Sequence, residues 1–334
     1  MLLPASIARR AAASARSHLA LALAAVSLAA IAPAHAGDAE PALLAFHAGD
    51  HVHYVVQECE TKTDDRYARP GVVKAPTCHA HDIDLAVLAI DATGAFQLRA
   101  TAKGPDDPYP LATMEQSTFA VRRALAHGVP VTLSVAKDGA SATLVDAPAL
   151  RAGVKAWFEA QVAGPAHADA AQVRRIVQKT DALPELELLA AAWAELKTLL
   201  TVDSVKLAPA TAVDGGETMV GPGLPMSLNM ARHVEVSALS ADGQGLTVTK
   251  TLTLEGERAK TMMTTLAEAM RARGPLSPHD EAELRDALSN PPFIRATTVT
   301  TVDLRTPWPA VVAQTLQMDL LHEHNRKETT FRRQ

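Results

Sequence analysis

The sequence predicts an α+β protein with an antiparallel, curved β-sheet and helices packed on one face of that sheet. Two observations predict this class: segments of alternating apolar and polar residues form hairpin patterns, and helical patterns follow them. Hydrophobic residues make up 48% of the 334 residues and charged residues 21%, which is typical of a folded chain. The order of strands followed by helices occurs twice, so two similar halves also fit, although no residue-level repeat is visible.

The first 36 residues have the three parts of a secretory signal peptide. Three arginines and no acid make the first part basic, the apolar run 19–32 follows, and small residues precede Gly37. We expect cleavage between Ala36 and Gly37. The apolar run is shorter than the roughly 20 residues of a membrane-spanning helix. The mature protein is therefore expected in the periplasm or outside the cell, without a transmembrane segment; an uncleaved anchor and twin-arginine export are the alternatives.

Hairpin patterns dominate the beginning of the mature chain. Residues 51–59 and 82–90 alternate between apolar and polar, and the turn Asp91–Gly94 leads into a returning strand. A second hairpin turns at Lys137–Gly139, and Asp146 is the expected N-cap of a helix. Residues 114–127 fit either a helix or a strand, and we favour a helix. We expect strands at 51–59, 82–90, 95–102, 131–136 and 142–145, and helices at 114–127, after Asp146, at 168–179 and after Pro184.

Proline and glycine cluster at 208–225, which predicts a loop or linker between residues 37–207 and 226–334. The two parts can equally form one continuous domain. In the predicted strand 246–254, Lys250 alone interrupts the apolar side. We expect strands at 233–240, 246–254, 294–304 and 313–321, and helices at 257–273 and at 278–288, the latter with Ser277 as its N-cap.

Cys59 and Cys78 are the only cysteines, and both follow the signal peptide. In an oxidising compartment two such residues are expected to form a disulfide. An antiparallel pairing with Cys59 opposite Cys78 also places Tyr54 opposite Ile83, so the apolar sides of the two strands coincide. The bridge would close a loop of about 18 residues, which corresponds to roughly 3 kcal/mol of stabilisation. A redox-active pair is the alternative, but the Cys-x-x-Cys spacing is absent.

The same register places His51, His53, Asp82 and Asp84 on the polar side of the two strands, with His53 opposite Asp84. Alternate residues on paired strands can bring imidazole nitrogens and carboxylate oxygens within reach of one Zn²⁺ or Cu²⁺ ion. The alternative is a set of solvent-facing polar residues that form ordinary cross-strand pairs. Apart from this candidate metal site, the sequence predicts no cofactor.

Several classes of function are disfavoured by composition and by motif. Acidic residues (37) outnumber Lys and Arg (32), and aromatic residues make up only 4% of the chain, so a nucleic-acid partner is not expected. No phosphate loop, dinucleotide fingerprint, nucleophile elbow or His-Glu-x-x-His motif occurs. A catalytic triad assembled from distant residues is not readable from spacing, and the catalytic residues of any enzyme here are unknown.

The sequence therefore favours a soluble, non-enzymatic protein that binds a small or apolar ligand or another periplasmic protein. The order of elements faintly resembles that of the periplasmic carriers of lipids and lipoproteins, which fold a curved antiparallel sheet over helices; no motif supports this resemblance. The alternatives are a periplasmic hydrolase with a dispersed active site and a divalent-metal-binding protein. Clustered His, Asp and Ser with shifted pKa values in a cleft would favour the hydrolase, and a patch of exposed apolar surface or a dry cavity under the sheet would favour the carrier.

Overall fold

The computed structural model describes twelve stretches of the chain. They are residues 46–64, 75–104, 117–137, 139, 141–163, 169–200, 211–220, 227–238, 245–272, 274, 276–320 and 323–334. The predicted signal peptide and its cleavage site between Ala36 and Gly37 lie outside the described residues.

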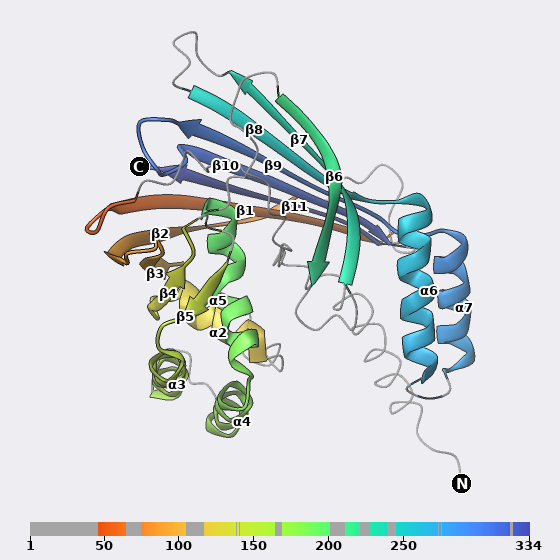
Figure 1. Ribbon diagram of the computed structural model, residues 1–334. Coiled ribbons are helices and arrows are strands. Elements are labelled where there is room, and N and C mark those ends of the chain that lie inside the picture. Colours follow the sequence, from red (N-terminus) through yellow and green to blue (C-terminus); the bar gives the residue numbers. More distant parts are fainter. Residues whose placement is uncertain are drawn as a thin grey trace.

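Eleven strands of the described residues form one antiparallel sheet (Figure 1). The strands are β1 (His51–Asp64), β2 (Thr77–Ile90), β3 (Phe96–Lys103), β4 (Val131–Val135), β5 (Ala142–Leu144), β6 (Thr211–Val220), β7 (Ser227–Ala238), β8 (Gly245–Leu254), β9 (Phe293–Asp303), β10 (Val311–Leu320) and β11 (Glu323–Arg333). Their order in the sheet is β5-β4-β3-β2-β1-β11-β10-β9-β8-β7-β6. The predicted antiparallel sheet is confirmed, and its strands follow a curved surface (Figure 1).

Two meanders meet in the middle of this sheet. One runs outward from β1 to β5 and the other inward from β6 to β11, and the first and last strands pair with each other. Val56 of β1 lies opposite Phe331 of β11, which lies opposite Val312 of β10. The two parts of the chain therefore share one hydrogen-bonded sheet. The predicted two similar halves, and the division of the chain into 37–207 and 226–334, stay predictions.

Strand β6 occupies residues 211–220, inside the segment 208–225 that the sequence predicts as a loop or linker. The prediction is wrong for these ten residues. Gly215 and Gly216 conceal the strand pattern because glycine has no side chain to pack and weakens a strand. An edge strand tolerates them, since β6 pairs only with β7 and residues 212–216 are exposed.

Six helices lie within the described residues. They are α2 (Ser117–Ala126), α3 (Ala147–Ala163), α4 (Ala170–Asp181), α5 (Glu185–Leu200), α6 (Gly256–Ala272) and α7 (Pro278–Ser289). The predicted N-caps are both confirmed. The amide of Ala149 donates to Asp146 Oδ1 at 2.8 Å, and the amide of Asp280 donates to Ser277 Oγ at 3.1 Å.

One row of register partners defines the inner face of the sheet. Val56, Phe331 and Val312 on the central strands are followed by Thr300 on β9, Val248 on β8 and Val236 on β7. All six are buried. Directly opposed residues of paired strands point to the same side, so this row lies on one face, which we call the inner face. The opposite side is the outer face.

Helices α2 to α5 pack against the first meander. We call the buried apolar residues between them the aromatic cluster. Its buried residues come from β1 to β5, from the four helices and from the turn and strands around Trp308. Its aromatic members are Phe46, Tyr54, Phe96, Phe158, Trp193, Trp308 and Phe331. Tyr54 is fully buried, and its hydroxyl donates to the carbonyl of Pro309 at 2.9 Å. Burial raises the pKa of Tyr54 above its ordinary value of 10.0, so this phenol stays protonated.

Candidate functional site

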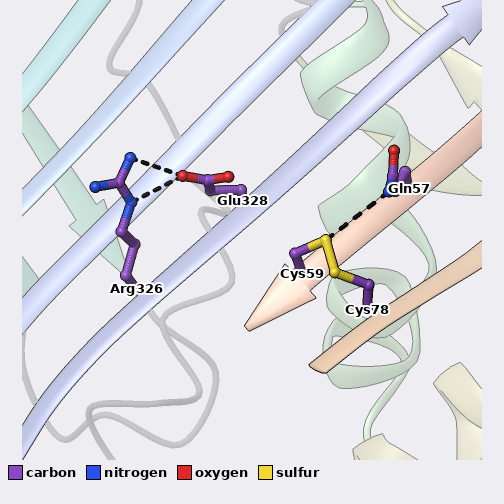
Figure 2. Close-up of a disulfide and its surroundings, with 5 residues drawn as sticks. All are labelled: Gln57, Cys59, Cys78, Arg326 and Glu328. Atoms are coloured by element: carbon purple, nitrogen blue, oxygen red, sulfur yellow. Dashed lines mark hydrogen bonds and ion pairs between the residues drawn. A yellow bond between two sulfur atoms is a disulfide. The ribbon is translucent and has the colours of Figure 1, made fainter. Parts of the chain in front are cut away.

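The disulfide between Cys59 and Cys78 is present and joins β1 to β2 (Figure 2). The two residues lie directly opposite each other, with their Cα atoms 4.0 Å apart. The predicted register is confirmed in full, since Tyr54 pairs with Ile83 and His53 pairs with Asp84. Cys78 is the second residue of β2, and Cys59 lies in the second half of β1. The side-chain amide of Gln57 lies 4.0 Å from Cys59 Sγ (Figure 2).

The four predicted metal ligands lie together on the outer face. His53 Nδ1 lies 2.9 Å from Asp84 Oδ1, and His53 Nε2 lies 3.6 Å from Asp82 Oδ1. His51 Nε2 lies 3.7 Å from Asp84 Oδ1. Within the described ranges, no group of three or more His, Cys, Asp or Glu side chains is arranged to hold a metal ion. Both carboxylates face imidazole nitrogens, and a Zn²⁺ or Cu²⁺ site here stays a prediction.

The same His–Asp pairing occurs twice more between strands. His233 Nδ1 of β7 lies 2.6 Å from Asp214 Oδ1 of β6, and His324 Nδ1 of β11 lies 2.8 Å from Asp319 Oδ1 of β10. Each pair consists of directly opposed residues. The recurrence fits the alternative interpretation, in which these side chains form ordinary cross-strand pairs on a solvated surface. Such exposed pairs contribute little to stability.

Clear pKa shifts in the described residues have local causes. The guanidinium of Arg305 lowers the pKa of Asp303 to about 2, and hydrogen bonds from Thr93 lower the pKa of Asp91. Each carboxylate also accepts a hydrogen bond from a backbone amide in the turn that its residue begins. The hydrogen bonds between Arg271 and Glu281 lower the pKa of the carboxyl and raise that of the guanidinium. These groups therefore serve turns and helix pairing, and the alternative of a hydrolase with a dispersed active site stays a prediction.

A second apolar cluster lies on the inner face under α6 and α7, and we call it the methionine cluster. Its buried residues are Leu228, Met230, Leu252, Leu254, Ala259, Met262, Met263, Leu266, Ala267, Leu284, Ala287, Ile294, Ala296, Met318 and Leu320. They come from β7 to β10 and from both helices. Four of them are methionines, each no more than 8% exposed, and none is aromatic. Figure 1 shows the α6–α7 hairpin well separated from α2 to α5.

An ion pair joins the two helices of the α6–α7 hairpin. Arg271 of α6 donates to Glu281 of α7 through Nε at 3.1 Å and Nη2 at 3.0 Å, which is a two-point pairing of guanidinium and carboxylate. Gly256 begins α6 with a φ of +56°, in the left-handed region that favours glycine. The hairpin therefore covers the methionine cluster and connects to β8 through Gly256, a glycine in the left-handed region.

Three charged side chains lie beside the methionine cluster on the inner face, and we call them the charged triad. Lys250 Nζ lies 2.7 Å from Glu217 Oε2, and Arg232 Nε lies 3.7 Å from the same oxygen. The side chains of Lys250, Arg232 and Glu217 are 21%, 19% and 11% exposed. In the sequence, Lys250 is the one residue that interrupts the apolar side of the predicted strand 246–254. Glu217 was missed because its strand was predicted as a loop, and Arg232 because it precedes the predicted strand 233–240.

No protein-family model and no curated protein sequence matches the chain. Among the described residues, no helix combines the length and the apolar character required to cross a bilayer. One solved structure found by structural superposition is titled "Lipid-protein interactions in lipovitellin", with a TM-score of 0.40 and 10% sequence identity. The superposition covers 86% of this chain and 25% of the lipovitellin chain, so this chain spans about a quarter of its length. At that TM-score the similarity carries no argument about fold or ligand.

Proposed function

We propose that this protein is an exported, non-enzymatic binding protein that carries a small apolar or amphipathic molecule in the methionine cluster, between the sheet and the α6–α7 hairpin. The observation that supports the proposal is the composition of that cluster: its described buried residues include four methionines and no aromatic residue, and they lie under a hairpin of their own. In this proposal the helices cover one face of the sheet. The aromatic cluster stabilises the fold, and the methionine cluster binds the ligand.

Methionine is the apolar side chain that adapts best to ligands of different shape. It is unbranched, has three rotatable bonds beyond Cα and carries a polarisable sulfur, so it fills irregular spaces and is used at permissive binding surfaces. Met262 and Met263 lie on α6, whereas Met230 and Met318 lie on strands β7 and β10. Flexible side chains therefore face the cluster from both the hairpin and the sheet. A core built only for stability favours side chains with well-defined rotamers.

The disulfide supports the proposed compartment. Disulfides persist in oxidising environments such as the periplasm and the extracellular space, and Cys59 and Cys78 are paired across β1 and β2. Together with the signal peptide predicted at residues 1–36, this supports export of the protein.

The proposal is tested by nuclear magnetic resonance of mature protein carrying ¹³C-methyl methionine, titrated with 1-decanol as a neutral apolar probe. We expect saturable shifts of the methyl resonances of Met230, Met262, Met263 and Met318, each assigned with a Met→Leu variant. The Met262→Leu/Met263→Leu variant keeps side-chain volume but removes flexibility, so it should unfold at nearly the same denaturant concentration and bind 1-decanol more weakly.

A matched control places a methionine in the aromatic cluster. Leu188 is fully buried on α5, and Leu188→Met conserves volume there. Its methyl resonance should stay unchanged while those of the methionine cluster shift. If 1-decanol leaves the methyls of the methionine cluster unchanged, or shifts the Leu188→Met methyl equally, the proposed binding site is wrong.

A further inference from the structure

We infer that the ligand is an amphipathic anion: a single alkyl chain that lies in the methionine cluster and ends in a carboxylate or phosphate head group bound by Arg232 and Lys250. This inference rests on the proposed function and adds the chemical class of the ligand. It depends on the position, burial and hydrogen-bonding capacity of the charged triad.

The charged triad directly adjoins the methionine cluster. Arg232 follows Met230 by two residues on β7, and Lys250 precedes Leu252 by two residues on β8, so each cation has a cluster member as its neighbour on the same face. Arg232 is also the register partner of Leu252, and Glu217 is the register partner of Met230. A molecule that lies in the cluster and extends along these strands therefore meets charged groups at one end.

The donors of the triad suit an anion. A guanidinium has five N–H donors and an ammonium three, whereas a carboxylate only accepts. Carboxylate and phosphate oxygens can bind the two cations in the same way as the Glu217 carboxylate does, at 2.7 Å from Lys250 and 3.7 Å from Arg232. The position of the Glu217 carboxylate shows how an anionic group can lie between Lys250 and Arg232. A cationic head group would face repulsion from both.

Partial burial strengthens this recognition. Lys250 and Arg232 are 21% and 19% exposed, so water competes only in part for their donors, while some access from solvent remains. Buried ion groups are costly, and replacing them with apolar side chains of similar volume is often neutral or stabilising. Lys250 interrupts a strand side that otherwise consists of Leu246, Val248, Leu252 and Leu254. A role in binding accounts for a charge at that position.

The polar row next to the triad extends the same surface across the sheet. Thr298 of β9 is the register partner of Lys250, and Gln314 of β10 is the register partner of Thr298. Both side chains are partly exposed. Hydroxyl and amide groups can donate to a head group that projects beyond the two cations. The inner face thus carries a polar row between the methionine cluster and a further set of buried apolar residues, which are Val234, Val236, Leu246, Val248 and Val302.

The test compares four probes at pH 7.5, each with a linear chain of ten carbons: decanoate, decyl phosphate, 1-decanol and decyltrimethylammonium. Affinities come from calorimetry, and the location comes from the methionine methyl resonances. We expect both anions to bind at least tenfold more tightly than 1-decanol and to shift the methionine cluster. The cationic probe should bind most weakly. The ratio between decanoate and decyl phosphate shows which head group is preferred.

Variants of the triad should change the preference in opposite directions. Arg232→Gln/Lys250→Gln should reduce decanoate affinity at least tenfold and leave 1-decanol affinity unchanged. Glu217→Gln should raise decanoate affinity, because the competing carboxylate is removed. Arg326→Gln is the matched control, since Arg326 lies on the outer face of β11 and pairs with the exposed Glu328 (Figure 2). This control should bind all four probes like the wild type.

The outcomes separate this inference from the proposed function. If decanoate and 1-decanol bind the methionine cluster equally and no triad variant changes their ratio, the inferred anionic ligand is wrong and the binding function stands. If no probe shifts the methionine cluster, both are wrong. Should the double variant fail to fold, Glu217→Gln decides, since unchanged or weaker decanoate binding by that variant contradicts the inference.

Discussion

The two helix-covered regions of the inner face are built from different side chains. In the aromatic cluster, Phe46 lies 4.6 Å from Phe96 and 4.7 Å from Trp308 between ring centroids, and no methionine is among the described buried residues. In the methionine cluster the described buried residues include four methionines and no aromatic ring. Both clusters lie on the same face of the same sheet, so the difference is not a consequence of topology.

The contrast assigns different tasks to the two regions. Aromatic rings bury large areas and have few rotamers, which gives a rigid, well-specified core. The ring–ring contacts connect β3 with residues that precede β1 and follow β9, so they hold distant parts of the chain together. Methionine side chains adapt to ligands of different shape, but they define the packing of a core less precisely. We expect stability to reside mainly in the first region and ligand binding in the second.

The largest expected effect is that of a truncation in the aromatic cluster. Phe158 is fully buried on α3, and its ring lies 4.8 Å from that of Trp157 in an edge arrangement. Phe158→Ala should reduce the free energy of unfolding by about 3–5 kcal/mol, because the cavity cannot collapse fully. Met263→Leu, in the methionine cluster, should cost less than about 1.5 kcal/mol. Urea unfolding measures both, and similar losses would remove the contrast in stability.

Removal of the disulfide is expected to have the next largest effect. Cys59→Ser/Cys78→Ser should reduce the free energy of unfolding by about 3 kcal/mol, since the cross-link restricts the unfolded chain. Wild-type protein unfolded in the presence of a reductant is the control and should lose the same amount. Because the bridge joins two strands of the first meander, ligand binding in the methionine cluster should be retained. Loss of binding would contradict the separation of tasks.

The α6–α7 hairpin should open locally more readily than α2 to α5. Arg271→Gln removes the two-point contact with Glu281, which is a largely exposed pair between the two helices. We expect faster amide hydrogen exchange in α6 and α7 and unchanged exchange in α3 and α4, because the lost contact lies between α6 and α7. Lys155→Gln on α3 is the control, since it removes another exposed ion pair. Equal acceleration in α3 would show that the regions do not open independently.

The sequence predicted the first region better than the second, for physical reasons. Pairing Cys59 with Cys78 sets the register of β1 and β2, and alternation then predicts which side is apolar. Two strands were missed: β6 because of Gly215 and Gly216, and β11 because its charged residues conceal the alternation. The methionine cluster combines residues from 228 to 320 across two helices and four strands. No local sequence pattern shows that these distant residues pack together. Lys250, which lies next to the cluster, was nevertheless visible as a charge on an apolar strand side.

The smallest effect concerns the turn between β9 and β10. Asp303 ends β9, and its carboxylate accepts hydrogen bonds from the Arg305 side chain at 2.8 and 3.0 Å and from the Arg305 amide at 3.1 Å. The turn leads to Trp308, which is buried in the aromatic cluster. The Arg305 hydrogen bonds lower the pKa of Asp303 from 3.8 to about 2. Because the folded pKa is the lower one, ionised Asp303 stabilises the protein above pH 3.8, and this contribution disappears as the pH falls toward 2.

Asp303→Asn should therefore unfold more easily than the wild type at pH 5, and most of the difference should be lost as the pH falls from 5 to 2. Denaturant unfolding of both proteins between pH 2 and 5 measures the difference. Asp319→Asn is the control: Asp319 pairs with His324 on the outer face and is not part of this turn. A difference for Asp303→Asn that is constant across this range would show that the carboxylate acts through turn geometry alone. Its charge would then not contribute to holding the turn that carries Trp308 into the aromatic cluster.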